Sequence, residues 1–265
     1  MSKKIVFVLL IFLTALPAHA GESGRQSVSE RPRIVDGVEA PVGAWPFMAA
    51  VVLAAVPVGQ FCGGALIHPR WVLTAAHCAV GMSAGRIDVV LGRHDLSSAA
   101  GERIAVSQIV IHPAYNPVSI DSDIALLRLA VPSVQPTIES PMSSSAADAP
   151  GVLATVMGWG SLTRKPPAPP GPPDVFPTVL YQTSVPILDL AICNAPAIYG
   201  GQLTGNMLCA GYLDGRTDSC QGDSGGPLVA PSAGGRYKHL GVVSFGAGCA
   251  WPGYPGIYTK VSNYS

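Results

Sequence analysis

Short apolar runs interrupted by glycine and proline dominate this chain of 265 residues, which contains 30 Gly and 25 Pro. Runs such as Met48–Val52, Phe61–Ile67 and Trp71–Thr74 are apolar and have the length of single strands. No heptad pattern, internal repeat or long amphipathic helical segment occurs. The pattern predicts an all-β fold in which many short strands are joined by turns.

Charged residues make up 12% of the chain, against about 25% in ordinary globular proteins. The formal net charge is zero. Nucleic acids and anionic membrane surfaces attract proteins with a basic excess, which this chain lacks. We therefore expect no nucleic-acid partner and no stable membrane association.

Residues 1–20 have the form of a secretory signal peptide. Lys3 and Lys4 are followed by the apolar run Ile5–Leu16 and by Ala18–Ala20, a small-x-small cleavage site. The alternative, a membrane anchor, needs roughly 20 apolar residues, and this run is shorter. We expect cleavage after Ala20 and delivery of the chain to a secreted or other extracytoplasmic space, where disulfides persist.

The stretch Asp218–Leu228 places Ser224 among three glycines and beside Asp223. Glycines permit close backbone approach and unusual dihedral angles, which suits a nucleophile with free backbone N–H groups beside it. A plain turn between two strands is the alternative interpretation of this stretch alone.

Two further motifs favour the catalytic interpretation. His77 follows the strand-like run ending at Thr74, and imidazole is the side chain that exchanges protons near neutral pH. Asp123 immediately precedes the apolar segment Ile124–Leu127, whereas Asp121 lies further into the loop and is expected to be solvated. The remaining histidines, which lack a flanking motif and are expected to be surface or structural groups, are His19, His68, His94, His112 and His239.

From Ile34 to about Val261, the chain resembles the chymotrypsin/trypsin family of serine endopeptidases, with His77, Asp123 and Ser224 in the family's order. The resemblance implies two packed antiparallel β-barrels with the active site in the cleft between them. It also implies that His77 is the general base, Asp123 orients it, and Ser224 attacks the substrate carbonyl. The N–H groups of Gly222 and Ser224 are expected to form the oxyanion hole.

The resemblance places Asp218 at the base of the main specificity pocket, where a carboxylate selects Arg or Lys in the substrate. Taken alone, Asp218 also fits a capped turn. Phe245 stands where the family often has Trp. The expected substrate-binding residues are Asp218, Ser219, Ser244, Phe245, Gly246 and Gly256.

Activation by proteolysis is a further expectation. In the family, cleavage after a residue corresponding to Arg33 frees an α-amino group on Ile34, which pairs with the carboxylate at Asp223. Arg31 is followed by proline, so Arg33 is the preferred cut. Alone, this segment also fits an ordinary loop that leads into a strand.

Six cysteines allow many pairings from sequence alone. The resemblance implies three bridges, Cys62–Cys78, Cys193–Cys209 and Cys220–Cys249.

We divide the chain into a signal peptide (1–20), an activation propeptide (21–33) and a peptidase domain (34–265). The first barrel is expected at about 34–140 and the second at about 150–265. Residues 165–173 contain six prolines, which predicts a stiff loop, either bordering the cleft on the leaving-group side or solvated. In the family, a terminal helix follows the segment corresponding to Tyr258–Ser265. Where that helix is missing, apolar surface on the first barrel is expected to be uncovered.

No His or Cys spacing typical of a metal site occurs, and we expect no metal and no cofactor. Arg93 stands where a calcium loop of the family would need a carboxylate. The expected partners are protein or peptide substrates and proteinaceous inhibitors, and the chain is expected to be a monomer. The rival hypothesis is a catalytically weak or silent binding homologue of the same fold.

Overall fold

The structure is a computed structural model that describes residues 34–57, 59–139 and 146–264. The expected signal peptide and propeptide, including Arg33, lie outside the described residues. No helix in the described ranges has the length and hydrophobicity needed to cross a membrane.

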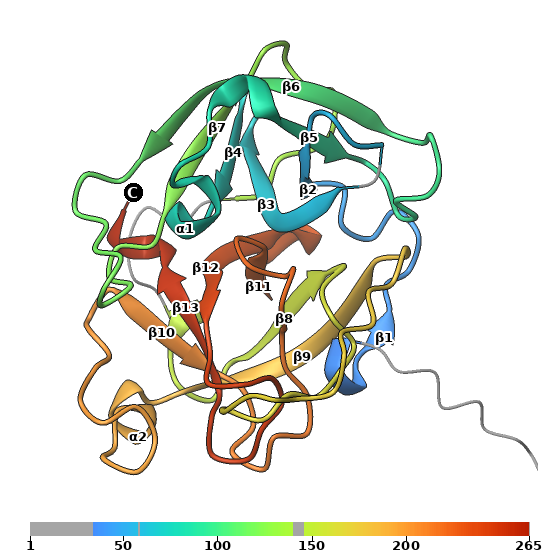
Figure 1. Cartoon of the computed structure of the whole chain (residues 1–265). Coiled ribbons are helices and arrows are strands. Elements are labelled where there is room, and N and C mark those ends of the chain that lie inside the picture. Colours follow the sequence, from blue (N-terminus) through green and yellow to red (C-terminus); the bar gives the residue numbers. More distant parts are fainter. Residues whose placement is uncertain (1–33, 58, 140–145, 265) are drawn as a thin grey trace, which may run out of the picture. The chain divides into compact units, whose positions relative to one another are not determined.

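Six antiparallel strands close into a first barrel, in the order β2-β3-β4-β7-β6-β5. Figure 1 shows it as the cyan and green half of the chain. Burial alternates along β7, where Ala125, Leu127 and Leu129 are buried and Arg128 is exposed, as expected when one face of a strand lines a packed interior. The strands are β2 (Met48–Leu53), β3 (Gln60–His68), β4 (Trp71–Thr74), β5 (Ile87–Leu91), β6 (Glu102–Ile111) and β7 (Ala125–Leu129).

A second ring of six antiparallel strands runs β9-β10-β13-β12-β11-β8 and closes through pairing of β8 with β9. Strand β1 (Val38–Glu39) precedes the first barrel in sequence but adds to β9 of the second (Figure 1). The ring's strands are β8 (Leu153–Gly158), β9 (Tyr181–Leu188), β10 (Met207–Ala210), β11 (Pro227–Pro231), β12 (Tyr237–Phe245) and β13 (Gly256–Lys260). The predicted all-β double barrel is therefore confirmed.

The described residues contain few and short helices. The two α-helices are α1 (Ala76–Ala79) and α2 (Leu190–Cys193), and the 3₁₀ turns are η1 (Ile34–Asp36), η2 (Ala84–Arg86), η3 (Ala146–Asp148), η4 (Ala233–Gly235) and η5 (Val261–Asn263). Helix α1 lies where the first barrel faces β12 and β13 of the second (Figure 1).

One apolar core continues from the first barrel into the second. The cluster that fills the first barrel also contains Met157, Trp159, Val229 and Val242, all from the second half of the chain. Close packing of this shared core fixes how loops from the two barrels meet.

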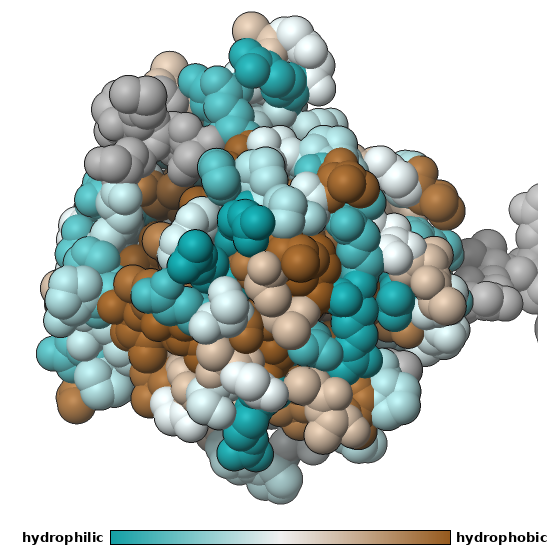
Figure 2. Space-filling model, turned by 90° about the horizontal axis from the view of Figure 1, so that it is seen from above, coloured by the Kyte–Doolittle hydropathy of each residue, from teal (hydrophilic) through white to brown (hydrophobic). Residues whose placement is uncertain are grey.

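An apolar groove lies on the first barrel beside η5, and Figure 2 shows hydrophobic surface interspersed with hydrophilic residues on one face of the molecule. The groove is lined by Ile67, Leu73, Val110, Ile111, His112, Pro113, Ile124, Ala125, Leu126, Val261 and Tyr264.

Candidate active site

His77 lies on α1, directly after the end of β4. Its backbone N–H donates to Oδ1 of Asp123 at 2.9 Å, and its ring Nδ1 lies 2.8 Å from Oδ2 of the same carboxylate. An ionised carboxylate can only accept, so Nδ1 carries the proton in this contact. The tautomer with an unprotonated Nε2 results, and that nitrogen can act as a base.

Asp123 is fully buried and is also held by the second barrel. The hydroxyl of Ser244, on β12, donates to its Oδ2 at 2.5 Å, and the hydroxyl of Thr259, on β13, donates to its backbone carbonyl at 2.8 Å. Sequence reasoning placed Ser244 in the substrate pocket and missed its bond to Asp123, and it missed Thr259 altogether. The available signal was a hydroxyl within each of two otherwise largely apolar strands.

Asp121 is not simply solvated, and that expectation is wrong. Its carboxylate is partly buried and accepts from Oγ1 of Thr204 at 2.5 Å and from Nδ2 of Asn206 at 3.2 Å. These partners precede β10, so Asp121 ties the loop before β7 to the second barrel. Its partners show a bracing contact, separate from the His77–Asp123 pair.

Ser224 lies in the loop before β11, and β3 holds its backbone. The N–H of Gly63 donates to the Ser224 carbonyl at 2.7 Å. The sulfur of Cys78 lies 3.6 Å from this carbonyl oxygen and 3.6 Å from Nε2 of His77. The junction of the barrels thus brings together His77 and Ser224, which are far apart in sequence.

The residue after Ser224 must be a glycine. Gly225 has a φ of +82°, and a Cβ built there would lie 2.2 Å from Oγ1 of Thr74 and 2.5 Å from the Gly63 carbonyl. Only glycine therefore permits the close approach of the two barrels behind Ser224.

Two backbone donors stand beside Ser224. Within the described residues, neither the N–H of Gly222 nor that of Ser224 donates a hydrogen bond. Gly222 has a φ of +95°, and its carbonyl accepts from Nε2 of Gln60 at 2.6 Å. This peptide orientation leaves both N–H groups available for an anionic oxygen.

Asp223 is fully buried and braces the same loop. Its Oδ1 accepts from the N–H of Gly160 at 2.8 Å, and its Oδ2 accepts from the N–H of Cys220 at 2.9 Å. Burial raises the pKa of Asp223 to about 6, although these two hydrogen bonds oppose the shift. Ile34 is also fully buried, in a cluster with Leu162 and Tyr181.

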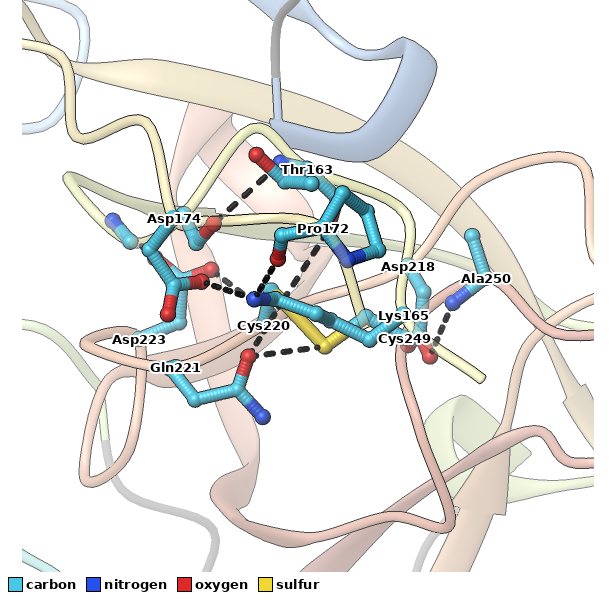
Figure 3. The surroundings of a disulfide bond; sticks show 12 residues. Thr163, Lys165, Pro172, Asp174, Asp218, Cys220, Gln221, Asp223, Cys249 and Ala250 are labelled. Atoms are coloured by element: carbon cyan, nitrogen blue, oxygen red, sulfur yellow. Dashed lines mark hydrogen bonds and ion pairs between the residues drawn. A yellow bond between two sulfur atoms is a disulfide. The ribbon is translucent and has the colours of Figure 1, made fainter. Parts of the chain in front are cut away.

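A pocket of about 190 Å³ opens beside Ser224, and the six expected substrate-binding residues all line it. Asp218 is 4% exposed, and the N–H of Ala250 donates to its Oδ2 at 3.1 Å (Figure 3). Its Oδ1 has no hydrogen-bond partner in the part of the chain that is described. Burial raises the pKa of Asp218 to about 7. Sequence reasoning missed two residues of the pocket lining, Gln221 and Gly248.

The three disulfides are Cys62–Cys78, Cys193–Cys209 and Cys220–Cys249, the pairs that the resemblance implies. The third lies in the pocket wall, where Oε1 of Gln221 contacts both of its sulfurs (Figure 3). Although Cys62, His77 and Cys78 cluster within 4.8 Å, the first bridge uses both thiols, so the cluster offers no thiolate to a metal.

Comparisons with known proteins agree with this geometry. The family model described as Trypsin matches residues 34–265. Trypsin-3 of Salmo salar is 40% identical over 211 residues, which cover 77% of this chain and 80% of that protein. Coagulation factor XII of Bos taurus is 36% identical over 263 residues, covering 94% of this chain and 41% of the relative. Transmembrane protease serine 5 of Homo sapiens is 39% identical, covering 88% and 50%. The chain thus spans half or less of these two longer relatives.

Proposed function

Because the chain belongs to the trypsin family of serine endopeptidases, we propose that it hydrolyses peptide bonds after Arg or Lys and is made as a secreted zymogen. The observation that carries the proposal is the fixed His77–Asp123 pair, with Ser224 held at the same junction.

Catalysis proceeds by acyl transfer. Nε2 of His77 takes the proton of the Ser224 hydroxyl, whose oxygen attacks the substrate carbonyl, and the imidazolium then protonates the leaving amine. Asp123 holds the ring and stabilises its charge. The N–H groups of Gly222 and Ser224 receive the developing oxyanion, and water then hydrolyses the acyl-enzyme.

Selectivity for Arg and Lys rests on Asp218. Its nearly buried carboxylate keeps Oδ1 without a partner among the described residues, facing a pocket of otherwise uncharged side chains. A guanidinium or ammonium that enters the pocket supplies the missing partner, and a guanidinium can bind a carboxylate through two parallel hydrogen bonds.

Activation follows cleavage after Arg33, which converts the Ile34 nitrogen into an ammonium. The burial of Ile34 and of Asp223 supports an ion pair between them that acts as a switch rather than as a source of stability. The carboxylate braces the loop of Gly222, so the pair orders the oxyanion hole. Residues 1–33 supply the signal and propeptide in this scheme.

The test is hydrolysis of Arg, Lys, Phe and Ala amide substrates by purified protein before and after a cut at Arg33. We expect hydrolysis of the Arg and Lys amides only after the cut. A serine-directed phosphonate distinguishes a silent binding homologue, which it leaves unlabelled. Preference of the cut protein for Phe or Ala amides would contradict the pocket assignment and leave the triad intact.

A further inference from the structure

The side chain of Arg164 joins three separate segments of the chain. One terminal nitrogen donates to the backbone carbonyls of Gly215 and Ala250. The other donates to Oδ2 of Asp36 at 2.9 Å. A guanidinium carries five N–H donors in a fixed planar fork, so one side chain can hold several acceptors at fixed directions.

All three contacted residues have left-handed backbone angles. The φ values are +61° at Asp36, +67° at Gly215 and +50° at Ala250. Asp36 and Ala250 carry a Cβ, so neither adopts this conformation without support from its surroundings. The three turns direct their acceptor oxygens at a common point, which Arg164 occupies.

Ala250 connects this cluster to the specificity pocket. Its carbonyl accepts from Arg164, and its N–H donates to Oδ2 of Asp218 at 3.1 Å. The adjacent residues pair too, because the Lys165 N–H donates to the Cys249 carbonyl at 3.1 Å and the reverse bond measures 3.0 Å. Figure 3 shows Lys165 beside the Cys220–Cys249 bridge and Ala250 beside Asp218. Residues 164 and 165 thus hold residues 249 and 250 of the pocket wall.

Asp36 connects the cluster to the activation segment, since it lies two residues after Ile34. Its side chain is 67% exposed and that of Arg164 is 39% exposed, so their ion pair adds little stability. The contact determines instead where the segment lies relative to the pocket wall.

We infer that Arg164 is a positioning residue that couples the activation segment to the specificity pocket. It holds the peptide at Ala250 so that the N–H keeps the Asp218 carboxylate oriented toward a substrate cation. The inference rests on the proposed roles of Asp218 in selecting Arg or Lys and of cleavage after Arg33.

Benzamidine, an aromatic cation of the size of the pocket's expected guest, tests this role in the cut protein. We expect Arg164→Gln to weaken benzamidine binding about tenfold, the effect of losing roughly one hydrogen bond to a charged group. KM for an Arg amide should rise by a similar factor, while kcat and the rate of labelling by a small serine-directed fluorophosphate stay within about twofold. Arg164→Lys retains the charge without the fork and should give an intermediate affinity.

Arg216→Gln is the matched control. Arg216 belongs to the loop that contains Gly215, but it pairs with Asp214 and lies over Tyr212 at the surface. Its loss should leave benzamidine affinity unchanged. Hydrogen exchange at the Ala250 amide gives a readout that does not depend on catalysis, and it should accelerate in Arg164→Gln alone.

Benzamidine affinity within about twofold of wild type in Arg164→Gln overturns the inference, because a lost positioning bond must cost more. If Arg164→Gln does not fold, Arg164→Lys decides by the same criterion. Wild-type protein that binds benzamidine but cleaves no Arg amide contradicts only the proposed activity. Wild-type protein that binds no benzamidine contradicts both.

Discussion

The hydroxyl of Ser244 donates to Oδ2 of Asp123 at 2.5 Å, and the same oxygen accepts from Nδ1 of His77. Ser244 belongs to β12 of the second barrel, whereas His77 follows β4 of the first. One buried carboxylate oxygen therefore receives a donor from each barrel. The orientation of the imidazole depends on how the two barrels pack, and a change at their interface should alter catalysis before it alters either barrel.

Asp123→Asn should lower kcat for an Arg amide about 10⁴-fold, because an amide at this position favours the wrong imidazole tautomer. KM should change little. Steady-state kinetics of the cut protein provide the measurement. Asp121→Asn is the matched control, since Asp121 accepts only from the second barrel and from its own loop. It should retain activity within about tenfold and lower the melting temperature instead. Equal loss of kcat in the two variants would refute the assignment of Asp123.

Benzamidine affinity should depend on pH through Asp218. Its pKa is raised to about 7 by burial, so protons compete with the cation below that pH. The dissociation constant should increase about tenfold for each pH unit below 7 and become flat above it. Calorimetry on Ser224→Ala protein, which cannot digest itself, gives the profile. Asp218→Asn should bind weakly at every pH. An unchanged affinity between pH 5 and pH 8 in protein with Asp218 would show that this carboxylate does not bind the cation.

Asp218 also has a sign of its own in stability. The pKa in the unfolded chain is near ~3.9, below the folded value, so the folded state holds the extra proton. The contribution is present below about pH 4 and is lost as the pH rises to about 7. Bound benzamidine should therefore raise the melting temperature more at pH 8 than at pH 5.

Arg33→Gln should remain inactive after treatment with an Arg-specific protease, because no ammonium forms at Ile34. Arg31→Gln should activate normally, since Pro32 already blocks cleavage after Arg31. Mass spectrometry of the new N-terminus, together with Arg-amide hydrolysis, checks both. Full activity of uncut Arg33→Gln protein would exclude the zymogen.

Gly222→Ala should lower kcat about 10²-fold with little change in KM, because it disturbs one donor of the oxyanion hole. The φ of +95° disfavours any residue with a Cβ, and that Cβ would lie 3.2 Å from Cα of Gly160. Gly43→Ala is a suitable control, because it also has a positive φ but has open space around its Cβ position. A Gly222→Ala variant with wild-type kcat would exclude this peptide from catalysis.

His239→Leu should make the fold less sensitive to acid. His239 is fully buried, both ring nitrogens lack a partner in the described ranges, and burial lowers its pKa to about 4. The folded pKa is below the unfolded value of ~6.5, so stability is lost as the pH falls from about 6.5 to about 4. Melting temperatures across this range should fall less steeply in the variant. His68→Gln, at an exposed position, should retain the wild-type slope.

Much of the fold was predictable because strand signals are local. The alternation along β7 can be read within five residues, and the short runs between Gly and Pro correspond to strands such as β2 and β4. The candidate triad was also predictable, because each member lies within a compact motif. Asp121 was not, since its partners Thr204 and Asn206 lie more than 80 residues away.

The sequence by itself determined the all-β class, the candidate nucleophile, base and carboxylate, and the family. Those conclusions depend on short segments whose chemistry and periodicity do not need the rest of the chain. Only the tertiary structure decided that Ser244 and Thr259 hold Asp123, that Asp121 braces the second barrel, and that Arg164 joins Asp36 to Ala250. The physical reason is that hydrogen-bond partners across a barrel junction are selected by packing of the shared core, which no local pattern encodes.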